Sequence, residues 1–159
     1  MPAIRAVVAA AFATAENPEP VEPGLVDDLR ESDAWLPALS VVGERDGEVA
    51  AHALLSRVTV EPGGVAALSL GPVAVRPADQ NTGLGTAVVR AALDAARDSG
   101  ETLVVVLGEP AYYRRFGFVP SAALTAPWSG SEYWQALALD PAGAEISGFV
   151  CYPEPWAGL

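Results

Sequence analysis

The sequence is short of the residues that build several common kinds of site. It contains no lysine, and His52 and Cys151 are its only histidine and cysteine. A single cysteine excludes an intrachain disulfide and fits a reducing compartment, so we expect a cytoplasmic protein. One histidine and one cysteine, without carboxylates at ligand spacing, exclude a transition-metal site built by the protein alone. We therefore expect no bound metal.

Long hydrophobic runs are also missing. No apolar stretch approaches the ~20 residues that cross a bilayer, and the N-terminus lacks the pattern of a secretory signal peptide. We therefore expect no association with a membrane. The 159 residues predict one domain over 1–159, which is large enough to bury a core.

Positive charge is scarce. The chain has 20 acidic residues and nine basic residues, all arginine, for a formal net charge of -11. This balance argues against nucleic acid as a partner, because nucleic-acid binding depends on basic surfaces. An anionic ligand would have to be held by backbone groups and a few arginines, whereas a cationic substrate would be weakly favoured by the overall field.

A glycine-rich turn between a strand and a helix organises the middle of the chain. The apolar run 68–75 predicts a buried strand, and Gln80-x-x-Gly83-x-Gly85 then opens an amphipathic helix. Free N–H groups converge at a helix N-terminus, and the helix dipole adds positive potential there. The glycines leave no Cβ between backbone and ligand. The pattern therefore predicts a phosphate or pyrophosphate site.

Hydrophobic periodicity and turn signals predict the other elements. We expect helices over residues 2–14, 25–30 and about 110–116, strands over 39–44, 49–60, 65–75, 102–107, 133–139 and 146–152, loops over 16–24 and 120–132, and turns at 46–47 and 140–143. A single crossover helix between 65–75 and 102–107 implies that these two strands are parallel neighbours. The antiparallel strands before the glycine turn exclude a dinucleotide-binding Rossmann fold.

The order of these elements resembles the GCN5-related N-acetyltransferase (GNAT) superfamily. The resemblance depends on the glycine turn with its strand and helix, and on Tyr113 four residues before Gly117-Phe118. The segment VLGEPAYYRRFGF looks like the YhbS-like branch of small bacterial acetyltransferases. The resemblance implies an α/β (α+β) domain with a mixed sheet, antiparallel apart from a central, splayed parallel pair, and helices on both faces.

The N-terminus departs from this family pattern. The family normally begins with a strand before its first helix, whereas this chain starts at the helix. The strand is either absent or lost through a later start of the chain. A missing edge strand would expose backbone groups of the sheet, and a second copy of the chain could pair there to form a homodimer.

The resemblance also implies acetyl-CoA as co-substrate. The pyrophosphate would bind the N–H groups of residues 81–86, and the pantetheine arm would run beside strand 68–75. The implied binding residues are Val73, Val75, Gln80, Asn81, Thr82, Gly83, Leu84, Gly85 and Thr86. Thr82 stands where the family often has Arg or Lys, so Arg76, Arg114 or Arg115 would have to supply that contact. Asn81 stands where glycine is common, but asparagine tolerates positive φ.

Acetyl transfer to an amine requires an acid, a base and stabilisation of an oxyanion. By resemblance, Tyr113 is the general acid that protonates the departing thiolate, although Tyr112 and Tyr113 could simply anchor their short helix. Glu109 and His52 are candidate bases, and Ser69 is a third. Each has a structural alternative, and a chain of water molecules could also remove the proton.

Two other readings of the sequence remain at this point. Cys151 and His52 with an acid could form a covalent relay, but a small buried thiol in the last strand is the alternative. The same site could also bind acyl-CoA without catalysis, as a sensor or interaction module. The acceptor would be a primary amine, either a small molecule or a peptide. Loops 16–24 and 120–132, with Trp35 and Trp128, are expected to wall its pocket.

Overall fold

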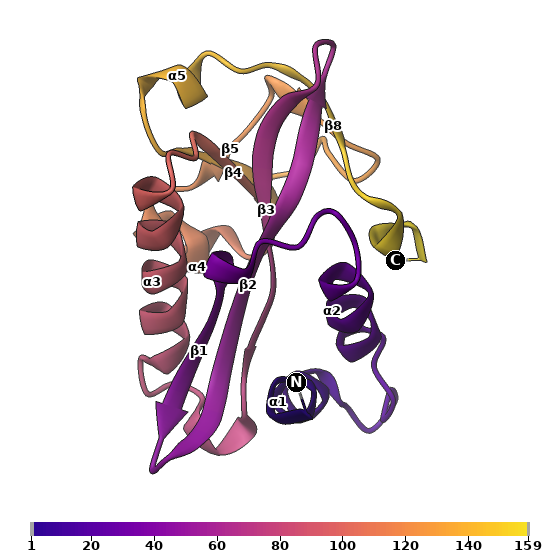
Figure 1. Ribbon diagram of the computed structural model, residues 1–159, viewed down its shortest axis with the longest axis vertical. Coiled ribbons are helices and arrows are strands. Elements are labelled where there is room, and N and C mark those ends of the chain that lie inside the picture. The colour runs from indigo at the N-terminus through magenta and orange to yellow at the C-terminus, as the bar shows by residue number, and fades with distance from the viewer. Residues whose placement is uncertain (1, 159) are drawn as a thin grey trace.

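A long, twisted sheet runs through the molecule and carries helices on both faces (Figure 1). The structure is a computed structural model that describes residues 2–158. Helix α3 (Leu84–Asp98) covers one face, whereas α1 (Pro2–Phe12) and α2 (Glu22–Arg30) lie on the other. The predicted fold class is therefore confirmed.

The sheet contains eight strands, and two further short helices follow β4 and β7 along the chain. The strands are β1 (Ser40–Arg45), β2 (Glu48–Glu61), β3 (Val65–Val75), β4 (Leu103–Leu107), β5 (Val119–Pro120), β6 (Leu124–Thr125), β7 (Trp134–Ala138) and β8 (Gly148–Cys151). The short helices are α4 (Pro110–Tyr113) and α5 (Pro141–Ala144). Along the sheet the order is β5-β7-β4-β3-β2-β8-β6, and β1 pairs with β2 beside this path.

The strands β3 and β4 form the predicted parallel pair, and they stay together only briefly. Two residue pairs join them, Leu68 with Val104 and Ser69 with Val105. Beyond these pairs, the edge of β3 that faces β4 has no partner strand up to Val75, although the other edge stays paired with β2. Strand β4 continues beside β7. The two strands therefore splay apart, which leaves one backbone edge of β3 open.

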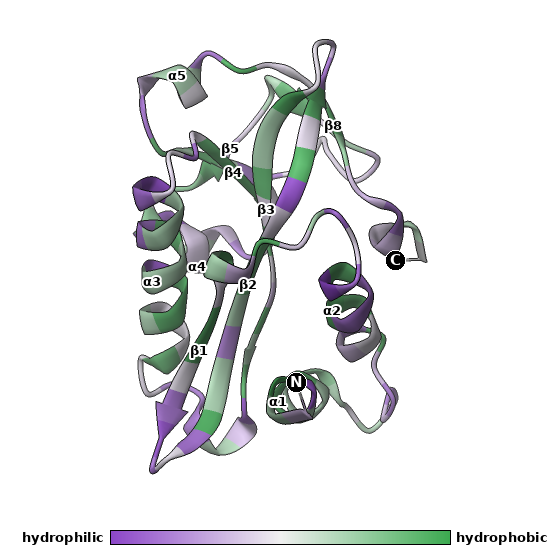
Figure 2. Cartoon of the chain, in the orientation of Figure 1, coloured by the Kyte–Doolittle hydropathy of each residue, from purple (hydrophilic) through white to green (hydrophobic). Residues whose placement is uncertain are grey.

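The two faces of the sheet belong to different cores because side chains alternate along a strand. On β2, Ala51, Ala53 and Leu55 face α3, whereas Leu54 faces α1 and α2. In Figure 2, hydrophobic residues occupy much of the sheet, and hydrophilic residues mark the β1–β2 turn. A third apolar cluster surrounds the fully buried Trp134.

Three predictions about the elements were wrong. The second helix begins at Glu22 because Pro23 can occupy a first turn, where no N–H partner is needed. The turn predicted at 140–143 is the start of α5, which Asp140 caps by accepting from the Gly143 N–H at 3.0 Å. The 120–132 loop contains β6, which pairs in parallel with β8, so the β3–β4 pair is not the only parallel one. Two-residue strands carry no periodicity, and the sequence therefore did not reveal β6.

The first strand along the described chain is β1, which follows both α1 and α2. Within residues 2–158, β1 pairs with β2 alone, and its other edge has no partner strand. Pairing of two copies through such an edge stays a prediction. None of the helices in residues 2–158 has the length and apolar character needed to cross a bilayer.

Helix α3 lies close against β1 because Gly43 has no side chain. A Cβ at this position would lie 2.8 Å from Val88 Cγ1 and 2.9 Å from Leu84 Cδ1. Leu84 is the first residue of α3, so this contact sets where the helix begins relative to the sheet.

We expect Gly43→Val to lower the free energy of unfolding by about 1–3 kcal/mol, because it overpacks the α3–sheet contact. Valine favours strands, so any loss reports packing and not backbone propensity. Urea denaturation would measure it. Gly24→Ala in α2 is the control, because no atom lies within 4 Å of its added Cβ. Equal stability of the Gly43→Val and parent proteins would show that α3 can move away without loss.

Candidate active site

The glycine turn is held in shape by positive backbone φ angles. A short 3-10 turn, Pro77–Asp79, follows β3. Asn81 then has φ of 62° and Gly83 has φ of 86°. Asparagine tolerates this left-handed conformation and glycine adopts it freely. The expectation that Asn81 can replace a glycine at this position is confirmed, and the turn delivers the chain directly into α3.

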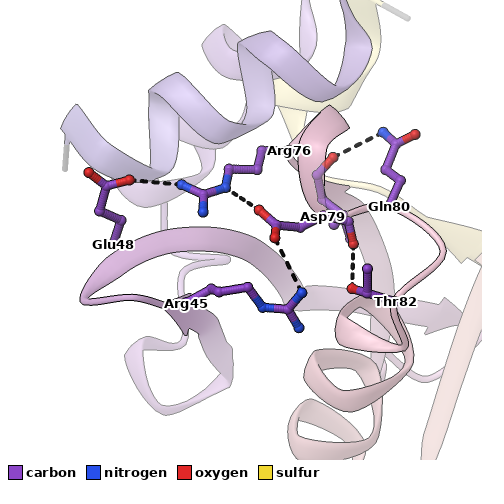
Figure 3. A network of polar contacts seen from close by, with 7 residues as sticks. Arg45, Glu48, Arg76, Asp79, Gln80 and Thr82 are labelled. Atoms are coloured by element: carbon purple, nitrogen blue, oxygen red, sulfur yellow. Dashed lines mark hydrogen bonds and ion pairs between the residues drawn. The ribbon is translucent and has the colours of Figure 1, made fainter.

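A buried carboxylate network holds the start of this turn (Figure 3). The Asp79 side chain is 8% exposed and accepts from Arg76 Nε and, at 3.3 Å, from Arg45 Nη1. Arg76 Nη1 also donates to Glu48 Oε2 at 2.9 Å. The Arg76 guanidinium holds the pKa of Asp79 below its ordinary value, and Arg45 acts in the same direction. Arg76 is therefore engaged by two carboxylates and is a poor phosphate ligand.

Two further hydrogen bonds order the turn itself. Thr82 Oγ1 donates to the Asp79 carbonyl at 2.5 Å, and Gln80 Nε2 donates to the Val75 carbonyl at 3.1 Å. The side chains at these two positions therefore shape the turn. An anion held here would meet mainly backbone N–H groups.

The N-terminus of α3 offers such groups. No side-chain hydrogen bond caps the helix at Gly83, and the Ala87 N–H is bonded to the Gly83 carbonyl at 3.0 Å. The N–H groups of Leu84, Gly85 and Thr86 precede that first helical bond and have no carbonyl four residues back within the helix. With the helix dipole, they form an anion site.

Arg115 is the arginine that lies beside this site. Its Nε donates to the Tyr112 carbonyl at 2.9 Å, and its Nη1 lies 3.5 Å from Thr86 Oγ1. The guanidinium also stacks 4.3 Å from the centre of the Tyr112 ring. Arg114 does not line the cleft at this site. Of the three candidate arginines, Arg115 is thus the one placed to add positive charge.

The open edge of β3 continues from this anion site. The Arg76 N–H bonds to the Ala50 carbonyl of β2 at 2.8 Å. Because successive backbone groups of a strand point to opposite sides, the N–H groups of Val73 and Val75 point away from β2. On that side β4 has already diverged, so a ligand can pair with these groups.

The turn, the β3 edge and α4 enclose a cleft of about 590 Å³, which we call the loop cleft. It is lined by Ala11, Phe12, Val73, Val75, Gln80, Asn81, Gly83, Gly85, Thr86, Tyr112, Tyr113 and Arg115. Of the predicted binding residues, Thr82 and Leu84 do not line it. Thr82 faces back into the turn, and Leu84 packs into the α3–sheet core.

A second hollow of about 660 Å³, which we call the aromatic cavity, lies on the other side of Tyr113. Both hollows are lined by Phe12, Val73 and Tyr113. The loop cleft and the aromatic cavity therefore meet where β3 and β4 splay, and Tyr113 stands at the junction.

Tyr113 is positioned by the strand end in front of it. A Cβ on Gly108 would lie 2.4 Å from Tyr113 Cε2, so only glycine lets the ring lie against the end of β4. The ring also packs edge-on against Phe118, with centroids 5.8 Å apart. Burial, together with the neighbouring Tyr112, raises the pKa of Tyr113 to about 12. The phenol therefore stays protonated at neutral pH.

The candidate bases lie in very different places. Glu109 is exposed, lines the aromatic cavity and caps α4 by accepting from the Ala111 N–H at 3.5 Å. Ser69 also lines that cavity, but its hydroxyl donates to the Tyr152 hydroxyl at 3.1 Å. His52 lines neither hollow. It is fully buried, and its Nε2 lies 2.8 Å from Ser40 Oγ.

The environment of His52 does not suit a general base that removes a proton from the acceptor amine. Burial lowers its pKa to about 4, and the charge of Arg30 acts in the same direction. The histidine is therefore neutral at physiological pH and belongs to the core between the sheet and α2. The structure gives the proposed role of His52 no geometric support.

The covalent relay fails on distance. Cys151 pairs with Thr59 on β2, seven residues along the strand from His52. At ~3.3 Å per residue, the two side chains lie on the order of 20 Å apart. The prediction of a buried thiol was also wrong, because Cys151, on β8, is partly exposed.

Comparison with known proteins identifies the family. A sequence model of the acetyltransferase (GNAT) family matches residues 9–118, well over half of the chain. The chain belongs to the GNAT acetyltransferase family. This match confirms the resemblance drawn from the glycine turn and from the segment around Tyr113. The members of this family are acyltransferases, so the protein belongs to a family of enzymes.

Relatives share both sequence and structure with this GNAT protein. The Escherichia coli K12 N-acetyltransferase YhbS is 35% identical over 137 residues, which cover 84% of this chain and 81% of that protein. The structure of E. coli YhbS in complex with CoA has a TM-score of 0.86 at 30% identity, over 98% of this chain and 86% of that one. A GNAT acetyltransferase from Brucella melitensis in complex with acetyl-CoA has a TM-score of 0.76 at 35% identity, over 98% of this chain and 90% of that one.

Sequence reasoning missed part of this GNAT site. Of the predicted pocket walls, Trp128 lines the aromatic cavity, but Trp35 packs under Arg30, whose guanidinium lies 4.9 Å from its ring. Glu22, in the predicted wall 16–24, also lines the cavity, whereas Phe12, Tyr152 and Trp156 line it and were not expected there. The aromatic residues of the C-terminal segment YPEPW were the available signal. No group of three or more His, Cys, Asp or Glu residues that could hold a metal occurs in the described part of the chain.

We expect Asp79→Asn to destabilise the protein at neutral pH and to have less effect in acid. The folded state holds the pKa of Asp79 below its unfolded value, so its carboxylate stabilises the fold above that value and loses this effect as the pH falls through the folded pKa. Urea midpoints at pH 7 and about pH 3 would test this, because the gap between variant and parent should shrink in acid.

Asp33→Asn is the control for charge alone, because Asp33 is exposed. A gap for Asp79→Asn that stays constant between the two pH values would show that the Arg76–Asp79–Arg45 network does not carry the stabilisation.

Proposed function

We propose that this GNAT protein transfers the acetyl group of acetyl-CoA to a primary amine by direct attack within a ternary complex. The observation that carries the proposal is the junction of two hollows at Tyr113. The loop cleft offers groups for an anionic, extended donor, and the aromatic cavity offers room for an acceptor. Both reactants can therefore reach the same point together.

The loop cleft fits coenzyme A along its length. The uncapped N–H groups at the start of α3, with Arg115 beside them, suit the pyrophosphate. The free edge of β3 at Val73 and Val75 suits the amides of the pantetheine arm, which would extend the sheet as a short strand does. The relatives whose structures contain CoA or acetyl-CoA support this assignment.

The chemistry needs few groups. The amine nitrogen attacks the thioester carbonyl carbon, a C–N bond forms, and the C–S bond then breaks. The amine loses one proton and the departing sulfur gains one. Unpaired backbone N–H groups at the splay, with that of Val73 nearest the junction, can stabilise the oxyanion formed between these steps.

Tyr113 serves the departing sulfur in this proposal. A thiol has a pKa of about 8.5, so complete proton transfer from a phenol with a pKa of about 12 is unfavourable. Tyr113 therefore acts by donating a hydrogen bond as negative charge develops on sulfur, and the released thiolate then takes its proton from solvent. Its raised pKa keeps this donor available across the neutral and mildly alkaline range.

For the base, we propose Glu109, either directly or through water. It is the one candidate that both lines the aromatic cavity and is open to solvent, where the amine proton must eventually go. Ser69 has already given its hydroxyl proton to the hydrogen bond with Tyr152.

The direct test is release of free CoA thiol from acetyl-CoA in the presence of a panel of amines. We expect turnover with at least one primary amine. Acetyl-CoA binding measured by calorimetry, with no turnover on any amine, would instead indicate an acyl-CoA-binding module. Failure to bind acetyl-CoA would overturn the whole proposal.

We expect Arg115→Met to weaken acetyl-CoA binding about tenfold, because a charge-assisted contact near the pyrophosphate is lost. Calorimetry would give the dissociation constant. Arg114→Met removes the same charge from the neighbouring position, which does not line the cleft, and should change affinity little. Equal losses for both variants would indicate a general charge effect and no specific contact.

We expect Tyr113→Phe to lower kcat on the order of 100-fold with little change in acetyl-CoA affinity, because the hydroxyl acts on the departing sulfur. Steady-state kinetics and calorimetry would separate the two effects. Tyr133→Phe removes an exposed hydroxyl away from both hollows and should leave both values unchanged. A Tyr113→Phe enzyme with parental kcat across pH would remove Tyr113 from the mechanism.

A further inference from the structure

The aromatic cavity has an unusual combination of walls. Phe12, Tyr113, Trp128, Tyr152 and Trp156 supply aromatic rings, and within residues 2–158 Glu22 and Glu109 are its only charged side chains. The basic residues of the chain are nine arginines and His52, and none of them lines the cavity. The cavity therefore presents apolar rings and negative charge, and no cationic side chain from the described residues.

The aromatic wall is firmly packed. Trp128, Tyr152 and Trp156 stack edge-on in a row, with ring centroids 4.7 Å and 5.3 Å apart. The Tyr152 hydroxyl is further held by Ser69 at 3.1 Å, and burial raises the pKa of Tyr152 to about 12. The rings thus form a neutral, preformed surface, whose faces attract cations as well as apolar groups.

Glu22 supplies the polar anchor. It lies in the first turn of α2, and its Oε2 atom is buried without a hydrogen-bond partner among the described residues. A buried carboxylate oxygen is costly to leave unpaired, and an ammonium group is the partner that best satisfies it. Because Glu22 lines the aromatic cavity, a rotation of its side chain would bring this oxygen to a bound ligand.

From these observations we infer the class of acceptor: a small primary amine that carries an aromatic or apolar body and no carboxylate. Glu22 recognises its ammonium group, and the aromatic row holds its body. This inference rests on the proposed acetyl transfer and narrows the acceptor within it. The amine must still lose a proton before it attacks, so Glu22 is a binding residue and not the base.

The same walls disfavour two other kinds of amine. An α-amino acid would bring its carboxylate against Glu22 and Glu109 with no cation to pair it, which is unfavourable in a cavity of low polarity. An amino sugar would bring several hydroxyl groups into a cavity whose lining offers few polar side chains to replace their hydrogen bonds to water. Specificity therefore comes as much from rejection as from attraction.

Kinetics with three probe amines test the inference. We expect 2-phenylethylamine to have a kcat/KM at least about 100-fold above those of phenylalanine and glucosamine, since a missing or misplaced polar partner changes specificity by such factors. Phenylalanine differs from 2-phenylethylamine only by its carboxylate, so this pair isolates the effect of charge. Equal kcat/KM for these two amines would overturn the inference.

A substitution then tests the anchor itself. We expect Glu22→Gln to raise the KM for 2-phenylethylamine about tenfold, with kcat and the dissociation constant of acetyl-CoA unchanged. Glu19→Gln is the matched control, because Glu19 is exposed in the preceding loop and does not line the cavity. An unchanged KM for Glu22→Gln, or an equal rise for Glu19→Gln, would refute the assignment of Glu22.

The outcome also separates this inference from the proposed function. Turnover of other amines but not of 2-phenylethylamine would refute the acceptor class and leave acetyl transfer standing. No turnover of any amine, with or without acetyl-CoA binding in the calorimeter, would refute both. Thermal unfolding of each variant, compared with the parent protein, would confirm that a changed KM does not come from a misfolded α2.

Discussion

The splay of β3 away from β4 is the constraint on which the site depends. Two residue pairs hold these strands together, and the remaining backbone groups on that edge of β3 then have no strand partner. Backbone polar groups are rarely left unpaired in a folded protein, so this edge must be satisfied by solvent or by a ligand. The splay therefore creates the binding edge, opens space for two hollows and brings them together at one point.

The glycine turn adds charge recognition without basic side chains of its own. Thr82 and Gln80, at two of its positions, bond back to the backbone of the turn, and Arg76 is engaged by Asp79 and Glu48. What is left for an anion is the uncapped start of α3 and the single guanidinium of Arg115. In a chain of net charge -11, the positive potential of these backbone N–H groups can still attract an anionic group.

Much of the fold could be predicted because its signals are local. The Asp46-Gly47 turn, the valine-rich run of β4 and the glycine start of α3 each specify their own conformation within a few residues, and all three lie where predicted. The parallel pairing of β3 with β4 followed from a single crossover helix. The pairing of β6 with β8 did not, because two-residue strands have no pattern of their own.

The sequence by itself determined the order of the elements, the family and the shape of the glycine turn, since these depend on residues close together in the chain. Only the tertiary structure decided what lines the aromatic cavity. Ser69 and Tyr152 meet across 83 positions, and Glu22 and Trp156 come from opposite ends of the chain to line one cavity. The tertiary structure also showed that His52 is buried in the core. The alternation of side chains along β2 predicts which residues share a face, but it does not predict which face carries the site. Long-range packing of this kind leaves no periodicity in the sequence. The loops 16–24 and 120–132 could therefore be expected at the cavity, where Glu22 and Trp128 line it, but Phe12, Tyr152 and Trp156 could not.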